Sequence, residues 1–209
     1  MKQISILMLC LVAFSASAQN EFDGANWKAP YTLNFPEGWG VERFLIPIEF
    51  APQIHYKGVE DLRFAPGWPN EKSDEYWTYA FLWYLDEVPV TNEAGIQANL
   101  NAYYTGLIGR NIEKRKIPSE KVFPVKTSMK EVSAAQGDLK TFHGTIAMLD
   151  YMAQKPITLN CVVHLKSCPG QPKGFMFYEI SPKPMTDKVW TSHHNSRSKL
   201  RLFYAAFKF

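Results

Sequence analysis

The chain has 209 residues, of which 46% are hydrophobic and 21% charged, and these values are typical of a folded globular protein rather than a disordered one. Its formal net charge is only +3 and its basic residues are scattered, which excludes the basic patch of a nucleic-acid-binding protein. Aromatic residues make up 14% of the chain, which favours β structure with aromatic packing and permits a surface that stacks on sugars.

Residues 1–18 have the three-part layout of a secretory signal peptide. Lys2 supplies the positive start, residues 4–14 an apolar run, and Ala16-Ser17-Ala18 the small-residue cleavage site. The run is shorter than the roughly twenty apolar residues that span a bilayer, and Cys10 lies among bulky residues that do not fit lipid attachment. The sequence therefore predicts a secreted or periplasmic protein, cleaved after Ala18, with no transmembrane segment in the mature chain.

The mature chain, residues 19–209, has the size of one domain. Between residues 27 and 70, Pro and Gly punctuate short strands. The stretch 42–50 alternates between apolar and polar side chains, which predicts a strand with one buried face. Pro47 cannot donate a ladder hydrogen bond, so this strand lies at a sheet edge or carries a bulge there.

The segment 73–87, SDEYWTYAFLWYLDE, is the most unusual part of the chain. As an extended strand it is apolar on both faces, with Trp77 and Trp83 on one of them. A continuous apolar run bounded by charge is typical of a central strand that is covered on both sides. The acids at residues 74–75 and 86–87 then mark the ends of that strand.

The clearest helix covers residues 92–112. Thr91 or Asn92 caps its start, and apolar residues recur at three- and four-residue steps along one stripe. The basic residues 114–116 complement the negative helix end and Pro118 stops the helix, so this cluster needs no polyanionic partner. Three glycines inside or near the helix mark positions of close packing: Gly95, Gly106 and Gly109.

After the helix the apolar period returns to two. The alternating stretches 123–129, 139–150, 157–165 and 175–180 are joined by short turns, which predicts an antiparallel meander. At the C-terminus, residues 200–207 fit a helical stripe as well as an aromatic strand, and the stripe favours a helix. We therefore expect a single α+β domain with an antiparallel sheet of about six or seven strands and the helix 92–112 packed on one face.

Two cysteines remain after the leader, Cys161 and Cys168. An oxidising compartment would permit a disulfide between them. Their spacing opposes it, because seven residues of continued strand would separate them by about 23 Å, whereas a disulfide needs Cα atoms within about 7 Å. The sequence leaves this pairing open.

Several chemistries lack their motifs in this sequence. No zinc, EF-hand, phosphate-loop or nucleophile-elbow pattern occurs, so neither a metal nor a cofactor is indicated. His143 shares a strand face with apolar residues, which predicts a core or edge histidine, and His164 shares a face with polar residues, which predicts a surface position. Neither histidine has a motif partner for catalysis.

The best catalytic candidates are the carboxylates at the ends of the aromatic strand, above all Asp86 and Glu87. Glycoside hydrolysis uses two carboxylates about 5 to 10 Å apart, with aromatic walls that hold the sugar. Asp74 and Glu75 flank the other end of the strand. The simpler interpretation is that all of these acids are solvated strand ends.

The best binding candidates are Trp39 and Trp68, which each follow a glycine in an expected loop. Aromatic side chains on loops favour recognition of a glycan or of a partner protein, although such a tryptophan can also fold back over the core. We therefore expect an exported, non-catalytic ligand-binding or envelope-associated protein. A carboxylate-dependent hydrolase that acts on glycans is the alternative.

Overall fold

The computed structural model describes residues 22–190 and 201–202, so the predicted signal peptide lies outside the described residues. One helix, α1 (Glu93–Ile112), and a short 3-10 turn, η1 (Ser119–Lys121), accompany nine strands within this part of the chain. Two short strands pair with each other, β1 (Tyr31–Thr32) and β9 (Arg201–Leu202). The main sheet contains β2 (Gly40–Ile46), β3 (Gly58–Phe64), β4 (Tyr79–Leu85), β5 (Lys126–Val132), β6 (Lys140–Asp150), β7 (Lys155–Ser167) and β8 (Gly174–Ser181).

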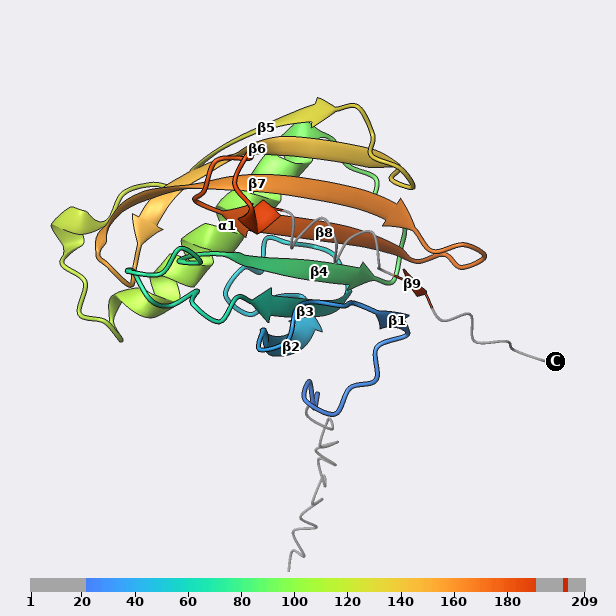
Figure 1. Ribbon diagram of the computed structural model, residues 1–209, viewed down its shortest axis with the longest axis horizontal. Helices are drawn as coiled ribbons and strands as arrows, with labels where there is room; N and C mark the ends of the chain where they lie inside the picture. The colour runs from blue at the N-terminus through green and yellow to red at the C-terminus, as the bar shows by residue number, and fades with distance from the viewer. Residues whose placement is uncertain (1–21, 191–200, 203–209) are drawn as a thin grey trace, which may run out of the picture.

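The main sheet has the strand order β2-β3-β4-β8-β7-β6-β5, and every neighbouring pair is antiparallel. Two meanders, β2 to β4 and β5 to β8, join where β4 pairs with β8. The helix α1 links them by running across one face of the sheet, behind the strands in Figure 1. The predicted α+β fold, with one antiparallel sheet and one main helix, is confirmed.

The two strands with the most distinctive sequences are both present, but the strand predicted over 42–50 ends at Ile46, so residues 47–50 lie outside it. All seven residues of β4 are buried, and β3 and β8 flank it, as expected for a strand that is apolar on both faces. The strand begins at Tyr79, because residues 65–78 form a series of turns. β2 is an edge strand and ends directly before Pro47, which cannot donate to a ladder.

The helix follows its sequence signals closely. The Asn92 side chain caps it by accepting a hydrogen bond from the Gly95 amide at 3.0 Å. Of its predicted close-packing glycines, Gly106 is the one that faces another segment, because a Cβ there would lie 1.7 Å from the Phe50 carbonyl oxygen. Nothing lies within 4 Å of a Cβ at Gly109. Gly106 therefore lets α1 approach the connection between β2 and β3.

Two hydrophobic clusters cover the two faces of the sheet. The larger one fills the space between α1 and the sheet and includes Cys161. The smaller one lies on the opposite face beneath the N-terminal segment and includes Cys168. Both cysteines are buried free thiols, so the disulfide considered from their sequence positions is not formed. The extended β7 strand keeps them apart, as their spacing indicated.

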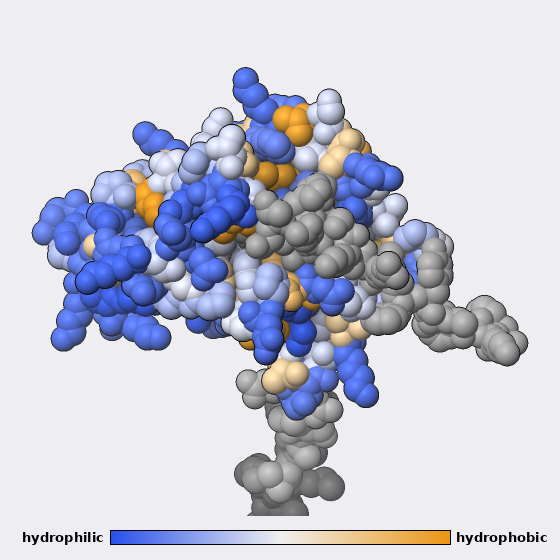
Figure 2. Space-filling model, in the orientation of Figure 1, coloured by the Kyte–Doolittle hydropathy of each residue, from blue (hydrophilic) through white to orange (hydrophobic). Residues whose placement is uncertain are grey.

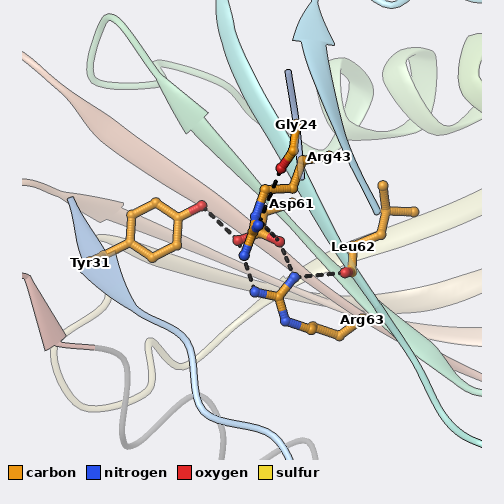
Figure 3. Close-up of polar contacts among 6 residues, drawn as sticks. All are labelled: Gly24, Tyr31, Arg43, Asp61, Leu62 and Arg63. Carbon is orange, nitrogen blue, oxygen red and sulfur yellow. Dashed lines mark hydrogen bonds and ion pairs between the residues drawn. The ribbon is translucent and has the colours of Figure 1, made fainter. Parts of the chain in front are cut away.

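A buried charged network ties the N-terminal segment to the second face (Figure 3). The Asp61 carboxylate on β3 is fully buried and accepts from Tyr31 at 3.0 Å and from the Arg63 guanidinium. Arg43 on β2 approaches the same carboxylate at 3.2 Å and donates to the Gly24 carbonyl at 3.3 Å. Because each of these groups has a partner here, we assign the network a structural role.

The predicted C-terminal helix over 200–207 falls largely outside the described residues, and residues 201–202 form the strand β9 instead. Within residues 22–190 and 201–202, no helix has the length and hydropathy that a membrane crossing requires. In the orientation of Figure 1, the described surface is mainly hydrophilic, with small and separate hydrophobic areas (Figure 2). The part of this face that Figure 2 shows for the described residues therefore has no broad apolar area.

Candidate functional site

The candidate site is a cavity of about 140 Å³ between α1 and the β2–β3 side of the sheet. Strand alternation directs its sheet residues, because every second residue of β2 and β3 faces the helix. From the helix side, Tyr103 and Leu107 complete the wall. Eight aromatic side chains line the cavity: Phe44, Phe50, Phe64, Trp68, Trp77, Tyr79, Tyr103 and Tyr151.

The loop 65–78 supplies two of these rings. The Trp77 amide donates to the Trp68 carbonyl at 3.0 Å, and the Glu75 carboxylate accepts from the Gly67 amide at 2.8 Å. These bonds hold the half-buried Trp68 against the buried Trp77, with ring centres 6.2 Å apart. The loop belongs to the aromatic-rich segment that stood out in the sequence.

Trp77 has a left-handed backbone, with φ of 53°. This conformation costs about 1 to 3 kcal/mol in a bulky residue and persists only where the surroundings impose it. Such strain gathers at functional sites more often than elsewhere. Here the packing of its ring against Tyr151, at 5.1 Å between centres, holds Trp77 on the inner wall of the cavity.

Beneath the cavity, Glu60 of β3 is fully buried and accepts a hydrogen bond from the Tyr103 hydroxyl at 2.8 Å. Burial raises the pKa of Glu60 to about 8, although the hydrogen bond from Tyr103 acts in the opposite direction. The negative charge of Glu42 adds to the rise. At neutral pH this carboxyl is therefore mostly protonated, and it adds little charge to the cavity.

Two charged side chains stand at the mouth of the cavity, Glu42 from β2 and Arg110 from α1, and both residues are exposed. Neither of them joins an ion pair within the described part of the chain. The Arg110 guanidinium lies over the Phe50 ring, 5.2 Å from its centre. The cavity thus combines an aromatic interior with one carboxylate and one guanidinium at its entrance.

The two tryptophan candidates separate in the structure. Trp68 lines the cavity, whereas Trp39 stacks on Phe35 with ring centres 4.6 Å apart and is not part of the lining. A shallow hollow beside the cavity shares Trp68, Phe64 and Glu42 with it. Trp68 therefore lies between the cavity and the outer surface.

The carboxylate candidates lie elsewhere. Asp86 and Glu87 are exposed and follow the end of β4, whereas the cavity is at the start of that strand. A strand of this length spans about 20 Å. Asp86 accepts from Lys173 at 2.6 Å, and at the other end Asp74 accepts from Lys183 at 2.9 Å. The structure does not bring Asp86 and Glu87 together with Trp68.

His143, which was predicted in the core or at an edge, is exposed. The prediction that His164 lies at the surface is wrong, because its side chain is buried. The Nδ1 of His164 lies 2.6 Å from Asp138, and its Nε2 lies 3.0 Å from Glu179. Burial opposes the charged form, but the hydrogen bonds to these two carboxylates outweigh it and raise the pKa of His164. A polar strand face can thus be buried when its groups pair with one another.

Among residues 22–190 and 201–202, no group of three or more His, Cys, Asp or Glu side chains is arranged to hold a metal ion. No protein-family model, no curated protein and no solved structure matches the chain.

Proposed function

We propose that this protein is an exported, non-catalytic binding protein that takes a ring-sized ligand group into its aromatic cavity. The observation that carries the proposal is the cavity itself, which has a volume of about 140 Å³ and eight aromatic side chains in its lining. An apolar cavity of about 150 Å³ accommodates benzene. The export part of the proposal comes from the leader-like residues 1–18.

The polar groups of the wall favour an aromatic or aliphatic ring over a sugar. Recognition of a sugar requires side chains that are free to bond its hydroxyls. At the inner end of the cavity the Tyr103 hydroxyl donates to Glu60, and the hydroxyls of Tyr79 and Tyr104 bond to each other. The buried Nε1 of Trp77 is a donor without a partner there, and the charged Glu42 and Arg110 stand only at the exposed rim. A ligand ring would therefore meet mainly the faces and edges of aromatic side chains.

The same geometry favours binding over hydrolysis. Glycoside hydrolysis needs two carboxylates that flank the bond to be cleaved. The carboxyl nearest the floor, Glu60, is fully buried, is not part of the cavity lining, and accepts from Tyr103 through one oxygen, whereas Glu42 stands at the mouth. Asp86 and Glu87 lie at the far end of β4. No pair of carboxylates among the described residues faces the aromatic walls together.

The direct test is an NMR titration with benzyl alcohol, which has one ring and no charge. We expect saturable binding to the purified protein, weakened about fivefold by Trp68→Ala through loss of ring contact. The matched control is Trp39→Ala, which removes a loop tryptophan outside the cavity and should leave the affinity unchanged. Equal effects of the two substitutions, or no binding at millimolar concentration, would refute the proposal.

A second pair of variants fills the cavity instead of opening it. Leu107 lines the cavity from α1, so Leu107→Trp should occupy the ring site and abolish binding. Thr105→Trp adds the same side chain at an exposed position of the same helix and should not change binding. Circular dichroism melting checks that each variant folds.

A further inference from the structure

We infer that the mouth of the cavity is built for a zwitterion, and that the ligand class is the free aromatic α-amino acid. This inference rests on the proposed binding function and adds the ligand's charges to it. The ring would enter the cavity, the ammonium group would face Glu42, and the carboxylate would face Arg110.

The charge arrangement is the first support. Glu42 and Arg110 line the same cavity from opposite sides, one on an edge strand and one on the helix, yet they do not pair with each other. Within the described residues neither has another ion-pair partner. An anion and a cation without ion-pair partners at one entrance match a ligand that carries both charges, as the ammonium and carboxylate groups attached to one carbon of an α-amino acid do.

The interior favours a neutral ring over a quaternary ammonium group, which is the other common guest of aromatic walls. Two of the aromatic rings that line the cavity already make a cation–π contact with an arginine. The Arg110 guanidinium lies 5.2 Å from the centre of the Phe50 ring, and the Arg115 guanidinium lies 5.1 Å from the centre of the Tyr151 ring. A third cation inside the cavity would be repelled by both. A benzene-sized ring fits the volume without this cost.

The exposure of the lining residues fits the same orientation. Trp77, Tyr79 and Tyr103 are buried at the inner end, whereas Glu42 and Arg110 are exposed at the outer end. An amino acid that enters ring first would leave its charged groups at the solvent-facing rim. There they could form charge-assisted hydrogen bonds without the full loss of hydration that burial would require.

The test compares four ligands on the unmodified protein by isothermal titration calorimetry. L-phenylalanine carries the ring and both charges, 3-phenylpropanoate lacks the ammonium group, 2-phenylethylamine lacks the carboxylate, and benzyl alcohol lacks both. We expect L-phenylalanine to bind about tenfold more tightly than each single-charge analogue, because charge-assisted hydrogen bonds are the strong ones.

Variants then assign each charge to its partner. Glu42→Gln should lower the affinity for L-phenylalanine to the level of 3-phenylpropanoate, and Arg110→Gln should lower it to the level of 2-phenylethylamine. Arg110→Lys keeps the charge and should retain part of the affinity. Because the four-ligand series needs no substitution, the test remains decisive even if a variant does not fold.

The outcomes separate the two levels of the proposal. If all four ligands bind within twofold of one another, the zwitterion inference is overturned while the ring-binding function stands. If single-charge analogues bind as tightly as L-phenylalanine, the inference also fails. If none of the four binds, benzyl alcohol included, both the inference and the proposed function are overturned.

Discussion

Replacing Glu60 by glutamine should abolish a pH dependence of stability that the buried carboxyl introduces. Glu60 is 0% exposed and accepts from the Tyr103 hydroxyl at 2.8 Å. Glutamine has the same shape, stays neutral at every pH, and can hydrogen-bond to Tyr103 through either end of its amide. The substitution therefore removes the ionisation while it keeps the packing beneath the cavity.

The magnitude follows from the raised pKa. Burial moves the pKa of Glu60 from 4.5 to about 8, so the folded protein holds a proton that the unfolded chain releases. The stability from this group is fully present below pH 4.5 and is lost as the pH rises through about 8. Across that window the loss amounts to about 4 to 5 kcal/mol.

Urea unfolding at pH 5, 7 and 9 measures this effect as the difference between the original protein and Glu60→Gln. The two should have similar free energies of unfolding at pH 5, and Glu60→Gln should be the more stable by about 4 kcal/mol at pH 9. The control is Glu120→Gln, which changes an exposed carboxylate on η1. A constant difference between the original protein and Glu60→Gln from pH 5 to pH 9 would show that the reasoning is wrong.

Three further predictions concern packing, a buried histidine and the thiols. Gly106→Ala should destabilise the fold by about 2 kcal/mol or more, because its Cβ meets backbone, whereas Gly109→Ala should stabilise it by about 0.5 to 1 kcal/mol in the same urea experiment. His164→Gln should lower the free energy of unfolding more at pH 5 than at pH 9. The raised pKa of His164 means that its protonated form stabilises the fold at low pH, and this contribution disappears as the pH rises. An equal loss of stability at both pH values would contradict this prediction. Burial raises the pKa of both Cys161 and Cys168, so an alkylating reagent should leave them unmodified in the folded protein. After unfolding without a reductant, mass spectrometry should find both cysteines alkylated. A disulfide between them would prevent alkylation of the unfolded protein.

The parts of the fold that the sequence predicted are those with a clear apolar period. The stripe along α1, the doubly apolar β4 and the apolar residues of β6 to β8 each bury a continuous apolar face, so local pattern and tertiary position agree. β5 (Lys126–Val132) lies three residues later than its predicted stretch 123–129 and buries only Met129. β3 was not identified as a separate strand, because GVEDLRF carries three charged residues in succession or alternation. These charges can be buried because each has a partner: Tyr103 on α1 for Glu60, Arg43 on β2 for Asp61, and Asp61 of the same strand for Arg63.

Of the two tryptophans predicted as binding residues, only Trp68 lines the cavity, because tertiary contacts rather than local sequence decide their positions. Trp39 and Trp68 have the same local context, a tryptophan after a glycine, and the sequence could not distinguish them. Their difference arises from the turns of the loop 65–78, which fold Trp68 onto the helix side of the sheet. Glu60 offered one signal, since strand alternation places it on the same face as Leu62 and Phe64.

The most direct test of the account is a set of intermolecular nuclear Overhauser effects between bound benzyl alcohol and the assigned side chains of the protein. We expect contacts from the ligand ring to Trp68 and Trp77, which line the cavity from the loop 65–78, and to Leu107, which lines it from α1. Contacts confined to other parts of the protein, with none to these three residues, would contradict the central claim that the cavity is the binding site.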